Sequence, residues 1–350
     1  MNYQLSVITP CHNVKMDLFQ RAYESLKKQT YGFENIEWVI TIHNSTEENA
    51  KEIEDMVGGN ANVILLRLNN DKRTPSSPRN HALKHATGTY IGFLDADDYF
   101  EEDVFEVALK HIQECEAQVA IFRYQTESDE EGRQPIRPLV LVDQTSERII
   151  FERETWDSRT FIYGAGMSIW TKIYDRQFLV DNGITFDEDV PLAEDNLFNL
   201  DCFSVAKRIC YLPQLIGYIY YLNGGSMVQS FNKSADEAMR YAKGIVKIFD
   251  HGLKYGLYMN NVMCDLLGYQ SAVMLASIDL TLAERQEVSD LLCPYMKMIT
   301  NIEVSKLYSA KMAKVIMTLP KMVLGHPKMI YRLSRMMKFL KIDIGSKIQV

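Results

Sequence analysis

The first 125 residues alternate short β-branched and aliphatic runs with stretches of helical periodicity. Runs at 5–9, 36–42, 63–68, 90–94 and 119–124 predict strands, and stretches at 17–29, 47–56, 78–86 and 101–114 predict helices between them. Such alternation is typical of βαβ units, in which neighbouring strands run parallel and helices cover the sheet. We therefore expect an α/β fold with a mostly parallel, twisted sheet, whose ligands bind beyond the carboxyl ends of the strands.

Length, cysteine spacing and charge narrow the class of protein. The chain has 350 residues, 47% of them hydrophobic, enough for a catalytic domain and a smaller C-terminal region. Its six cysteines form no CxxC pair, which argues against a zinc ribbon or a thioredoxin-like site. The net charge is −8, and ten Lys/Arg against one acid at 304–350 leave −17 on residues 1–303. This acidic body argues against general nucleic-acid binding.

Three carboxylates, Asp95, Asp97 and Asp98, directly follow the predicted strand at 90–94. Such a concentration of negative charge is costly unless a cation or several hydrogen-bond donors neutralise it. Mg²⁺ or Mn²⁺, held by one or two carboxylates and by diphosphate oxygens, is a natural partner. The alternative is a structural loop in which Asp98 caps a helix that begins near Glu101.

Further motifs follow one another in a characteristic order. They are Ser-Val-Ile-Thr-Pro-Cys-His-Asn at 6–13, Ser-Pro-Arg-Asn at 77–80, Gly-Thr-Tyr-Ile-Gly-Phe-Leu-Asp-Ala-Asp-Asp at 88–98, Ile-Trp-Thr-Lys-Ile-Tyr at 169–174, Asn-Gly-Ile-Thr-Phe at 182–186 and Ala-Glu-Asp-Asn-Leu-Phe at 193–198. The ordered set resembles family 2 glycosyltransferases of the GT-A fold, of the bacterial cell-surface polysaccharide and teichoic acid type. It implies a Rossmann-like mixed sheet flanked by helices over residues 1–230. Residues 231–350 would form a helical C-terminal region, with helices at 234–255, 260–277 and 281–298 and a capping box at Thr281 and Glu284.

The resemblance implies which residues bind a nucleotide-sugar donor. These are Thr9, Pro10, Asn13, His43, Arg79, Asp95 and Asp97. Thr9 and Pro10 would line the nucleotide pocket, while Asn13 would brace the loop after the first strand. Asp95 would approach the ribose, and Arg79 would contact the donor or support the acidic loop. Asp97 would coordinate the Mn²⁺ or Mg²⁺ ion that bridges the diphosphate.

On the acceptor side, the resemblance implies roles for Asp98, Trp170 and Glu194, and makes Asp195 the general base. Inverting transfer needs a carboxylate opposite the leaving group and no protein nucleophile. An aspartate that is partly desolvated beside Glu194 would gain proton affinity, as a base requires. The alternative for Glu194 and Asp195 is an acidic pair at a helix N-terminus, where the helix dipole favours it.

The sequence departs from the family after the second predicted strand. The family usually carries two acids there, one of which commonly reads the nucleobase, whereas this chain has Ile42 and His43. A neutral histidine can donate or accept a hydrogen bond but cannot act as a bidentate acceptor. UDP is the carrier that we expect, and the alternative for His43 is a residue that fills the loop.

The basic tail at 328–341 has helical amphipathicity. Ile330, Leu333, Met337 and Leu340 fall on one stripe, with Lys and Arg on the flanks and back. A cationic helix with an apolar face suits an anionic membrane surface. The chain has no stretch of about 20 apolar residues and no secretory signal, so we expect a cytoplasmic protein, peripheral at the inner face of the cell membrane. The alternative is that the stripe packs on the catalytic domain or on a second subunit in a homo-oligomer.

Two other whole-protein hypotheses are weaker. A sugar-1-phosphate nucleotidylyltransferase would carry a glycine-rich loop after the first strand, and this chain has none there. A scaffold that has lost donor binding would explain His43 but not the retention of Asp95, Asp97 and Asp195. The pair His81 and His85 has a metal-ligand spacing but no evident third ligand.

Overall fold

The computed structural model describes residues 3–72, 74–128, 145–154, 166–190, 193–222, 234–255, 260–277, 279–296 and 310–340. The chain divides into two compact units, which are described separately. The first comprises Met1–Asp157, Gly164–Glu188 and Phe198–Ser226, and the second comprises Ser158–Tyr163, Asp189–Leu197 and Met227–Val350.

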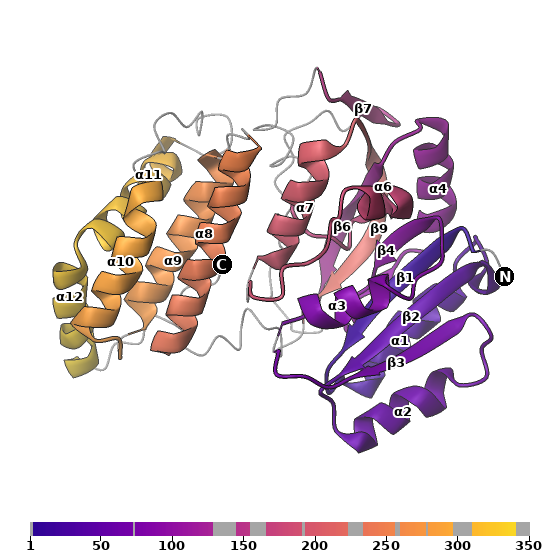
Figure 1. The fold of residues 1–350 in the computed structure, drawn as a ribbon, viewed down its shortest axis with the longest axis horizontal. Coiled ribbons are helices and arrows are strands. Elements are labelled where there is room, and N and C mark those ends of the chain that lie inside the picture. Colours follow the sequence, from indigo (N-terminus) through magenta and orange to yellow (C-terminus); the bar gives the residue numbers. More distant parts are fainter. Residues whose placement is uncertain are drawn as a thin grey trace. The chain divides into compact units, whose positions relative to one another are not determined.

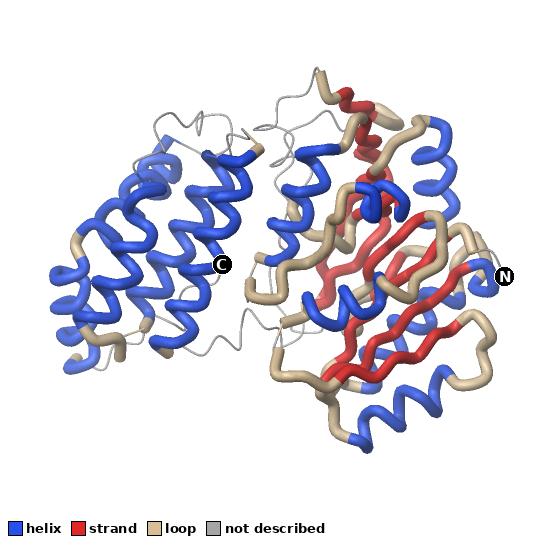
Figure 2. The backbone as a smooth tube through the Cα atoms, in the orientation of Figure 1, coloured by secondary structure: helices blue, strands red, loops and turns tan. Residues whose placement is uncertain are grey.

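A nine-stranded mixed sheet forms the centre of the first unit (Figures 1 and 2). Its order is β3-β2-β1-β4-β8-β6-β9-β5, with β7 also paired to β9. The strands are β1 Leu5–Cys11, β2 Ile36–His43, β3 Val63–Leu68, β4 Tyr90–Phe93, β5 Tyr99–Phe100, β6 Val119–Glu127, β7 Ile149–Glu152, β8 Lys172–Asp175 and β9 Arg208–Tyr221. The pairs among β1, β2, β3 and β4 are parallel, whereas β8 is antiparallel to β4 and β6. This arrangement confirms the predicted α/β class and the mixed sheet. The sheet is less parallel than expected, because β8, β5 and β7 pair antiparallel with their neighbours.

Helices connect the strands. They are α1 Met16–Lys27, α2 Glu47–Val57, α3 Ser76–Leu83, α4 Val104–Glu114, α6 Arg176–Asp181 and α7 Glu194–Val205, with a 3₁₀ turn at Phe33–Asn35. Of these, α1 to α4 lie where the sequence pattern predicts helices. The helix predicted to begin at 101 begins at Val104, because Tyr99 and Phe100 pair with β9. Asp103 is the N-cap residue of α4, so the idea that Asp98 caps this helix is wrong.

Aromatic packing fixes the core between β2 and the helices on that side. Trp38 is fully buried and stacks on Phe19 and Tyr23, with ring centroids 5.6 and 5.5 Å apart. Burial of side chains of this size is the dominant favourable term in folding. The core holds β1 and β2 in register, and this in turn sets where their carboxyl ends lie.

Five helices make up the described part of the second unit after residue 234, and they run alongside one another (Figure 2). They are α8 Ala235–Lys254, α9 Asn260–Ala276, α10 Leu282–Met296, α11 Ala310–Gly325 and α12 Pro327–Phe339. Ser234 caps α8 through the Glu237 N–H. The predicted capping box is confirmed, because Thr281 Oγ1 accepts from the Glu284 N–H and the Thr281 N–H donates to Glu284 Oε2. None of the helices that the structure describes is long and apolar enough to cross a membrane.

Arg285 joins three helices of this unit. Its fully buried guanidinium donates to the carbonyls of Met274 and Ser277 at the end of α9, and to Ser334 Oγ on α12 at 3.0 Å. Burial lowers the pKa of Arg285 to about 10, which leaves it charged at neutral pH. A cation is favourable at the C-terminal end of a helix, where the backbone carbonyls point outward.

Candidate active site

The acidic residues lie in a tight turn beyond the carboxyl end of β4, a central parallel strand. The Asp98 N–H donates to the Asp95 carbonyl at 3.1 Å and so closes the turn. Asp95 and Asp97 are half-buried, while Asp98 is only 1% exposed. The three carboxylates therefore differ in their access to a ligand, which the sequence alone did not indicate.

Arg79 supports this turn from α3. Its Nη2 atom lies 2.9 Å from Asp95 Oδ1, and its side chain is 4% exposed against 28% for Asp95. The guanidinium also lies over the ring of Phe186, 5.5 Å from its centroid. The structure thus brings together Arg79 and Asp95, two of the residues predicted for the donor side.

Tyr218 of β9 holds the turn from the other side. Its hydroxyl accepts from the Asp95 N–H at 3.2 Å and donates to Asp98 Oδ2 at 2.7 Å. The other oxygen of Asp98 accepts from the Tyr221 N–H at 2.8 Å. Both Asp98 oxygens are therefore engaged within the protein, which is the geometry of a residue that positions the loop. The contact of Asp98 with an acceptor stays a prediction.

The acidic turn carries excess negative charge. Burial, together with the charges of Asp97 and Asp95, raises the pKa of Asp98 well above its ordinary value. Burial, and the charge of Asp97, also raise the pKa of the Cys11 thiol at the end of β1. A divalent cation would relieve this unfavourable potential.

The donor set around Asp97 fits a hard divalent cation. Among the described residues no three His, Cys, Asp or Glu side chains gather into a metal cluster. Mg²⁺ and Mn²⁺ sites that use substrate phosphates need only one or two protein carboxylates, because phosphate and water oxygens complete the coordination. Asp97, which is half-buried next to the engaged Asp98, meets that requirement. The pair His81 and His85 interacts locally instead, with His85 Nδ1 2.8 Å from the His81 carbonyl.

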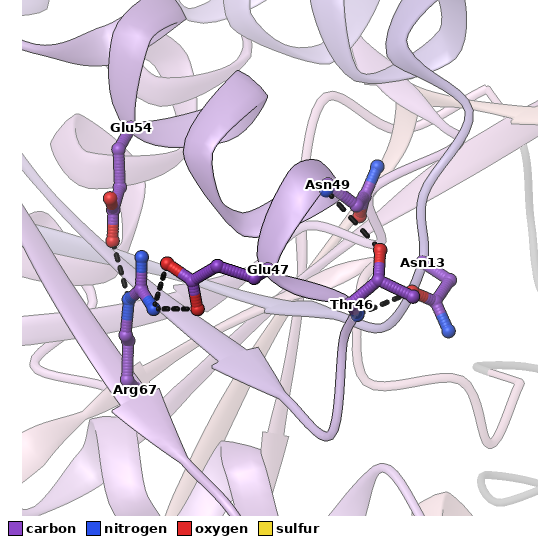
Figure 3. A network of polar contacts seen from close by, with 6 residues as sticks. All are labelled: Asn13, Thr46, Glu47, Asn49, Glu54 and Arg67. Atoms are coloured by element: carbon purple, nitrogen blue, oxygen red, sulfur yellow. Dashed lines mark hydrogen bonds and ion pairs between the residues drawn. The ribbon is translucent and has the colours of Figure 1, made fainter.

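Two loops are joined at the carboxyl ends of β1 and β2 (Figure 3). Asn13 adopts a left-handed φ of 44°, and its Oδ1 accepts from the Thr46 N–H at 2.9 Å. Its own N–H donates to Ser45 Oγ at 3.0 Å. These contacts are those expected of a residue that braces the loop after the first strand. The exposed pairs of Arg67 with Glu47 and Glu54 in the same view contribute little net stability.

Thr9 does not present its hydroxyl to this edge. The residue is fully buried, and its Oγ1 accepts from Trp38 Nε1 at 2.8 Å. Pro10 is half-exposed, so the nucleotide contact predicted for this strand is better placed at Pro10. The reason is the alternation of side chains along a strand, which the pattern 5–9 does not resolve when both faces are covered.

His43 lies in a buried polar network at the end of β2. It is 5% exposed, and its Nε2 lies 2.9 Å from Asn70 Oδ1. Asn70 donates to Ser77 Oγ at the start of α3, and His12 Nδ1 lies 2.9 Å from the His43 carbonyl. The histidine therefore connects three loops, in keeping with the loop-filling alternative. Its role in reading a nucleobase stays a prediction.

Trp170 belongs to an aromatic cluster beside the acidic turn. Its ring stacks on Tyr218 with centroids 4.4 Å apart and on Tyr220 at 5.7 Å. The ring of Tyr124 meets it edge-on at 4.7 Å. Trp170 as a whole is half-buried. Tyr218 therefore links the predicted acceptor-side residue Trp170 to the predicted donor-side residue Asp95.

Asn80 is a residue whose importance motif reading missed. Its side chain pairs with both main-chain groups of Phe186, donating at 2.8 Å and accepting at 2.9 Å. This contact holds α3, and with it Arg79, against the segment that contains Phe186. The available signal was its place in the Ser-Pro-Arg-Asn motif.

Glu194 and Asp195 belong to the second unit and lie in the first turn of α7. Glu194 is 7% exposed and Asp195 is half-buried. The charge of Glu194 contributes to raising the pKa of Tyr241 on α8, after burial and the charge of Glu237. Glu194 and Asp195 therefore lie at a helix N-terminus, as the structural alternative predicted. This position is compatible with a catalytic role, because a general base must also be held in place.

Comparison with known proteins finds a family match that covers most of the first unit. Residues 6–177 match the model of Glycosyl transferase family 2. Residues 6–177 form a family 2 glycosyltransferase domain. This match contains β1, the acidic turn after β4 and the Trp170 motif, and it ends before Glu194 and Asp195.

Two relatives show how far the likeness extends. The glycosyltransferase EpsJ of Bacillus subtilis, described as uncharacterized, is 27% identical over 72% of this chain and 71% of its own length. The poly(ribitol-phosphate) beta-N-acetylglucosaminyltransferase TarS of Staphylococcus aureus is 27% identical over 67% of this chain and 38% of its own. The chain thus spans well under half of TarS.

Solved structures share the fold of the glycosyltransferase domain. TarS residues 1–349, in complex with UDP-GlcNAc, superpose with a TM-score of 0.65 at 21% identity, over 95% of this chain and 92% of that one. The mannosyltransferase PcManGT of Pyrobaculum calidifontis, in complex with GDP-Man and Mn²⁺, gives 0.52 at 16% identity, over 93% and 86%. The predicted GT-A fold is confirmed.

Proposed function

We propose that this glycosyltransferase is a metal-dependent, inverting enzyme that moves a sugar from a UDP-linked donor to a hydroxyl of a cell-surface glycan or a lipid-linked acceptor. The observation that carries the proposal is the position of Asp97, half-buried in a negatively charged turn beyond a central parallel strand. Ligands of such sheets bind at this edge. TarS binds UDP-GlcNAc, a donor of the proposed UDP-linked class, and PcManGT binds GDP-Man with Mn²⁺, which belongs only to the wider class of nucleotide-diphosphate sugars.

Different residues of the chain would perform different parts of the transfer reaction. When bound at Asp97, Mn²⁺ or Mg²⁺ would stabilise the charge that develops on the leaving diphosphate. Arg79 fixes one oxygen of Asp95, which leaves the other for a ribose hydroxyl. Pro10 borders the nucleotide, and Trp170 offers a ring face to a sugar. Asp195 takes the proton from the acceptor hydroxyl as that oxygen attacks the sugar carbon.

A screen of nucleotide sugars tests the donor assignment. Hydrolysis of UDP-linked and GDP-linked sugars is followed with Mn²⁺, with Mg²⁺ and with EDTA. We expect turnover of a UDP-sugar that EDTA abolishes and Mn²⁺ restores. Turnover that EDTA leaves unchanged would remove the metal from the proposal, and preference for a GDP-sugar would overturn the UDP assignment.

Two matched pairs of variants test the residues. Asp97→Asn should abolish metal-stimulated turnover, while Asp103→Asn, an exposed acid six residues along, should not. Asp195→Asn should lose about 10²- to 10⁴-fold in transfer, as expected for a general base, and should keep donor affinity. Asp236→Asn, an exposed acid in the first turn of α8, is its control. Equal loss of donor binding in Asp195→Asn would assign that residue a structural role.

The proposed enzyme has one competing candidate, a non-catalytic scaffold. A glycosyltransferase-like protein that has lost donor binding is the second candidate, and the network that occupies His43 favours it. Calorimetry with UDP and Mn²⁺ distinguishes the two, because a scaffold should show no metal-dependent heat of binding.

A further inference from the structure

Helix α12, at the C-terminal end of the described chain (Figure 1), divides its apolar residues between a buried and an exposed face. The inward face carries Pro327, Ile330 and Ser334, all buried. Arg285 donates to Ser334 Oγ at 3.0 Å, which fixes the rotation of the helix about its axis. The stripe predicted at Ile330, Leu333, Met337 and Leu340 is therefore divided, because Ile330 is buried whereas Leu333 and Leu340 are exposed.

The second apolar face is exposed. Met329, Leu333, Met336 and Leu340 are 39%, 36%, 52% and 54% exposed. Their spacing of four, three and four residues places them on one stripe of a helix. Scattered single exposed apolar residues are normal on proteins, but an unbroken stripe over three turns marks an interaction surface.

Cations lie next to this stripe. Lys328, Arg332 and Arg335 are all exposed on α12, and Lys338 pairs with Asp279. Residues 310–340 contain seven Lys/Arg, at 311, 314, 321, 328, 332, 335 and 338, and no Asp or Glu. Because residues 1–303 are net acidic, the basic character of the chain is concentrated in this region.

The positive charge of α12 discriminates between the possible binding partners of the exposed stripe. The protein's own core already packs against the buried face of α12. A second copy paired about a twofold axis would place the same patch on both sides, and cations would then face cations. An anionic bilayer attracts the cations and accepts the apolar side chains at its interface. Charge complementarity therefore favours a lipid surface.

We propose that α12 is a docking surface for anionic lipid bilayers, with Met329, Leu333, Met336 and Leu340 entering the interface. Phe339, which is 86% exposed, extends the same contact toward the end of the helix. Lys328, Arg332 and Arg335 pair with lipid phosphates. The proposal goes beyond the transfer reaction and does not depend on it, since α12 contains none of the residues assigned to donor or acceptor.

Vesicle flotation with the full chain tests the proposal. The probes are vesicles of phosphatidylcholine alone and of phosphatidylcholine with about 30 mol% phosphatidylglycerol, an anionic fraction sufficient to attract basic residues. The charge variant carries Lys328→Gln, Arg332→Gln and Arg335→Gln. The stripe variant carries Met329→Gln, Leu333→Gln and Met336→Gln, because glutamine keeps the helix propensity.

We expect the wild type to float with the anionic vesicles and not with the neutral ones. Each cation near such a surface is worth about fivefold in affinity, so the charge variant should bind on the order of 100-fold more weakly. The stripe variant should lose at least about tenfold, from the apolar area no longer buried. Raising the salt from about 0.1 M to 1 M should weaken wild-type binding, because screening shortens from about 10 to 3 Å.

Matched controls exclude general effects of the substitutions. Lys28→Gln, Lys51→Gln and Lys110→Gln remove three exposed cations elsewhere, and Val180→Gln with Leu253→Gln removes exposed apolar side chains that are 59% and 49% accessible. Both controls should float like the wild type. Equal flotation of the wild type and the α12 variants would overturn the proposal. So would a stripe variant that halves the mass in light scattering without changing flotation, since the face would then pair two copies.

Discussion

Replacing Tyr218 with phenylalanine removes the hydroxyl through which β9 contacts both Asp95 and Asp98 of the acidic turn. The ring stays, and with it the stack on Trp170 at 4.4 Å. Two hydrogen bonds are lost, one to Asp98 Oδ2 at 2.7 Å and one from the Asp95 N–H at 3.2 Å. Tyr218 and Asp98 are both buried, so water cannot replace the donor. A buried hydrogen bond contributes about 1 kcal/mol, and a buried group left without its partner costs about 1–3 kcal/mol, so we expect Tyr218→Phe to destabilise the first unit by about 2–4 kcal/mol.

Calorimetry measures this loss directly. For a unit of this size each kcal/mol shifts the melting temperature by about 2–4 °C, so the transition of the first unit should fall by roughly 5–15 °C. Tyr31→Phe is the control, because it removes a partly buried hydroxyl that donates to Gln4 Oε1 at 2.7 Å, away from the turn. It should cost about 1 kcal/mol. Equal shifts for the two variants would refute the reasoning that Tyr218 holds the turn through a buried carboxylate.

Two further substitutions test the packing that supports the site. Gly88→Ala should destabilise the first unit by about 1–3 kcal/mol or more, because a Cβ would lie 2.5 Å from the backbone nitrogen of Ser6. Backbone atoms cannot move aside as a flexible side chain can. Urea unfolding of the variant that matches the wild type would contradict this prediction. Arg285→Met should lower the melting temperature of the second unit alone, by an amount equivalent to about 2–4 kcal/mol, since the carbonyls of Met274 and Ser277 lose the hydrogen bonds from the guanidinium. An unchanged transition would show that the cost of burying the charge offsets those bonds.

Local patterns determined most of the fold. The strand at 90–94 and the acids after it follow from hydrophobic runs and turn chemistry, both properties of neighbouring residues. The capping box at Thr281 and Glu284 was predicted for the same reason, because its contacts span three residues. The helix expected from 101 begins later because Phe100 pairs with Tyr218, a partner far along the chain.

The roles of the site residues depended on long-range contacts. The order of the motifs predicted that Arg79 and Asp95 act on the same side of the site, and the structure shows that their side chains form an ion pair. The inward turn of Asp98 depends on Tyr218 and Tyr221, more than 100 residues away, and no local pattern contains that information.

Taken by itself, the sequence determined that strands alternate with helices, that carboxylates follow a central strand, and that a cationic amphipathic helix lies near the C-terminus. Only the tertiary structure decided which side of each element meets the core. In β1 it directs the Thr9 hydroxyl inward to Trp38, and in α12 it buries Ile330 and leaves Leu333 exposed. Periodicity states which residues share a face, but two apolar faces of one helix are equivalent until a neighbour such as Arg285 packs against one of them.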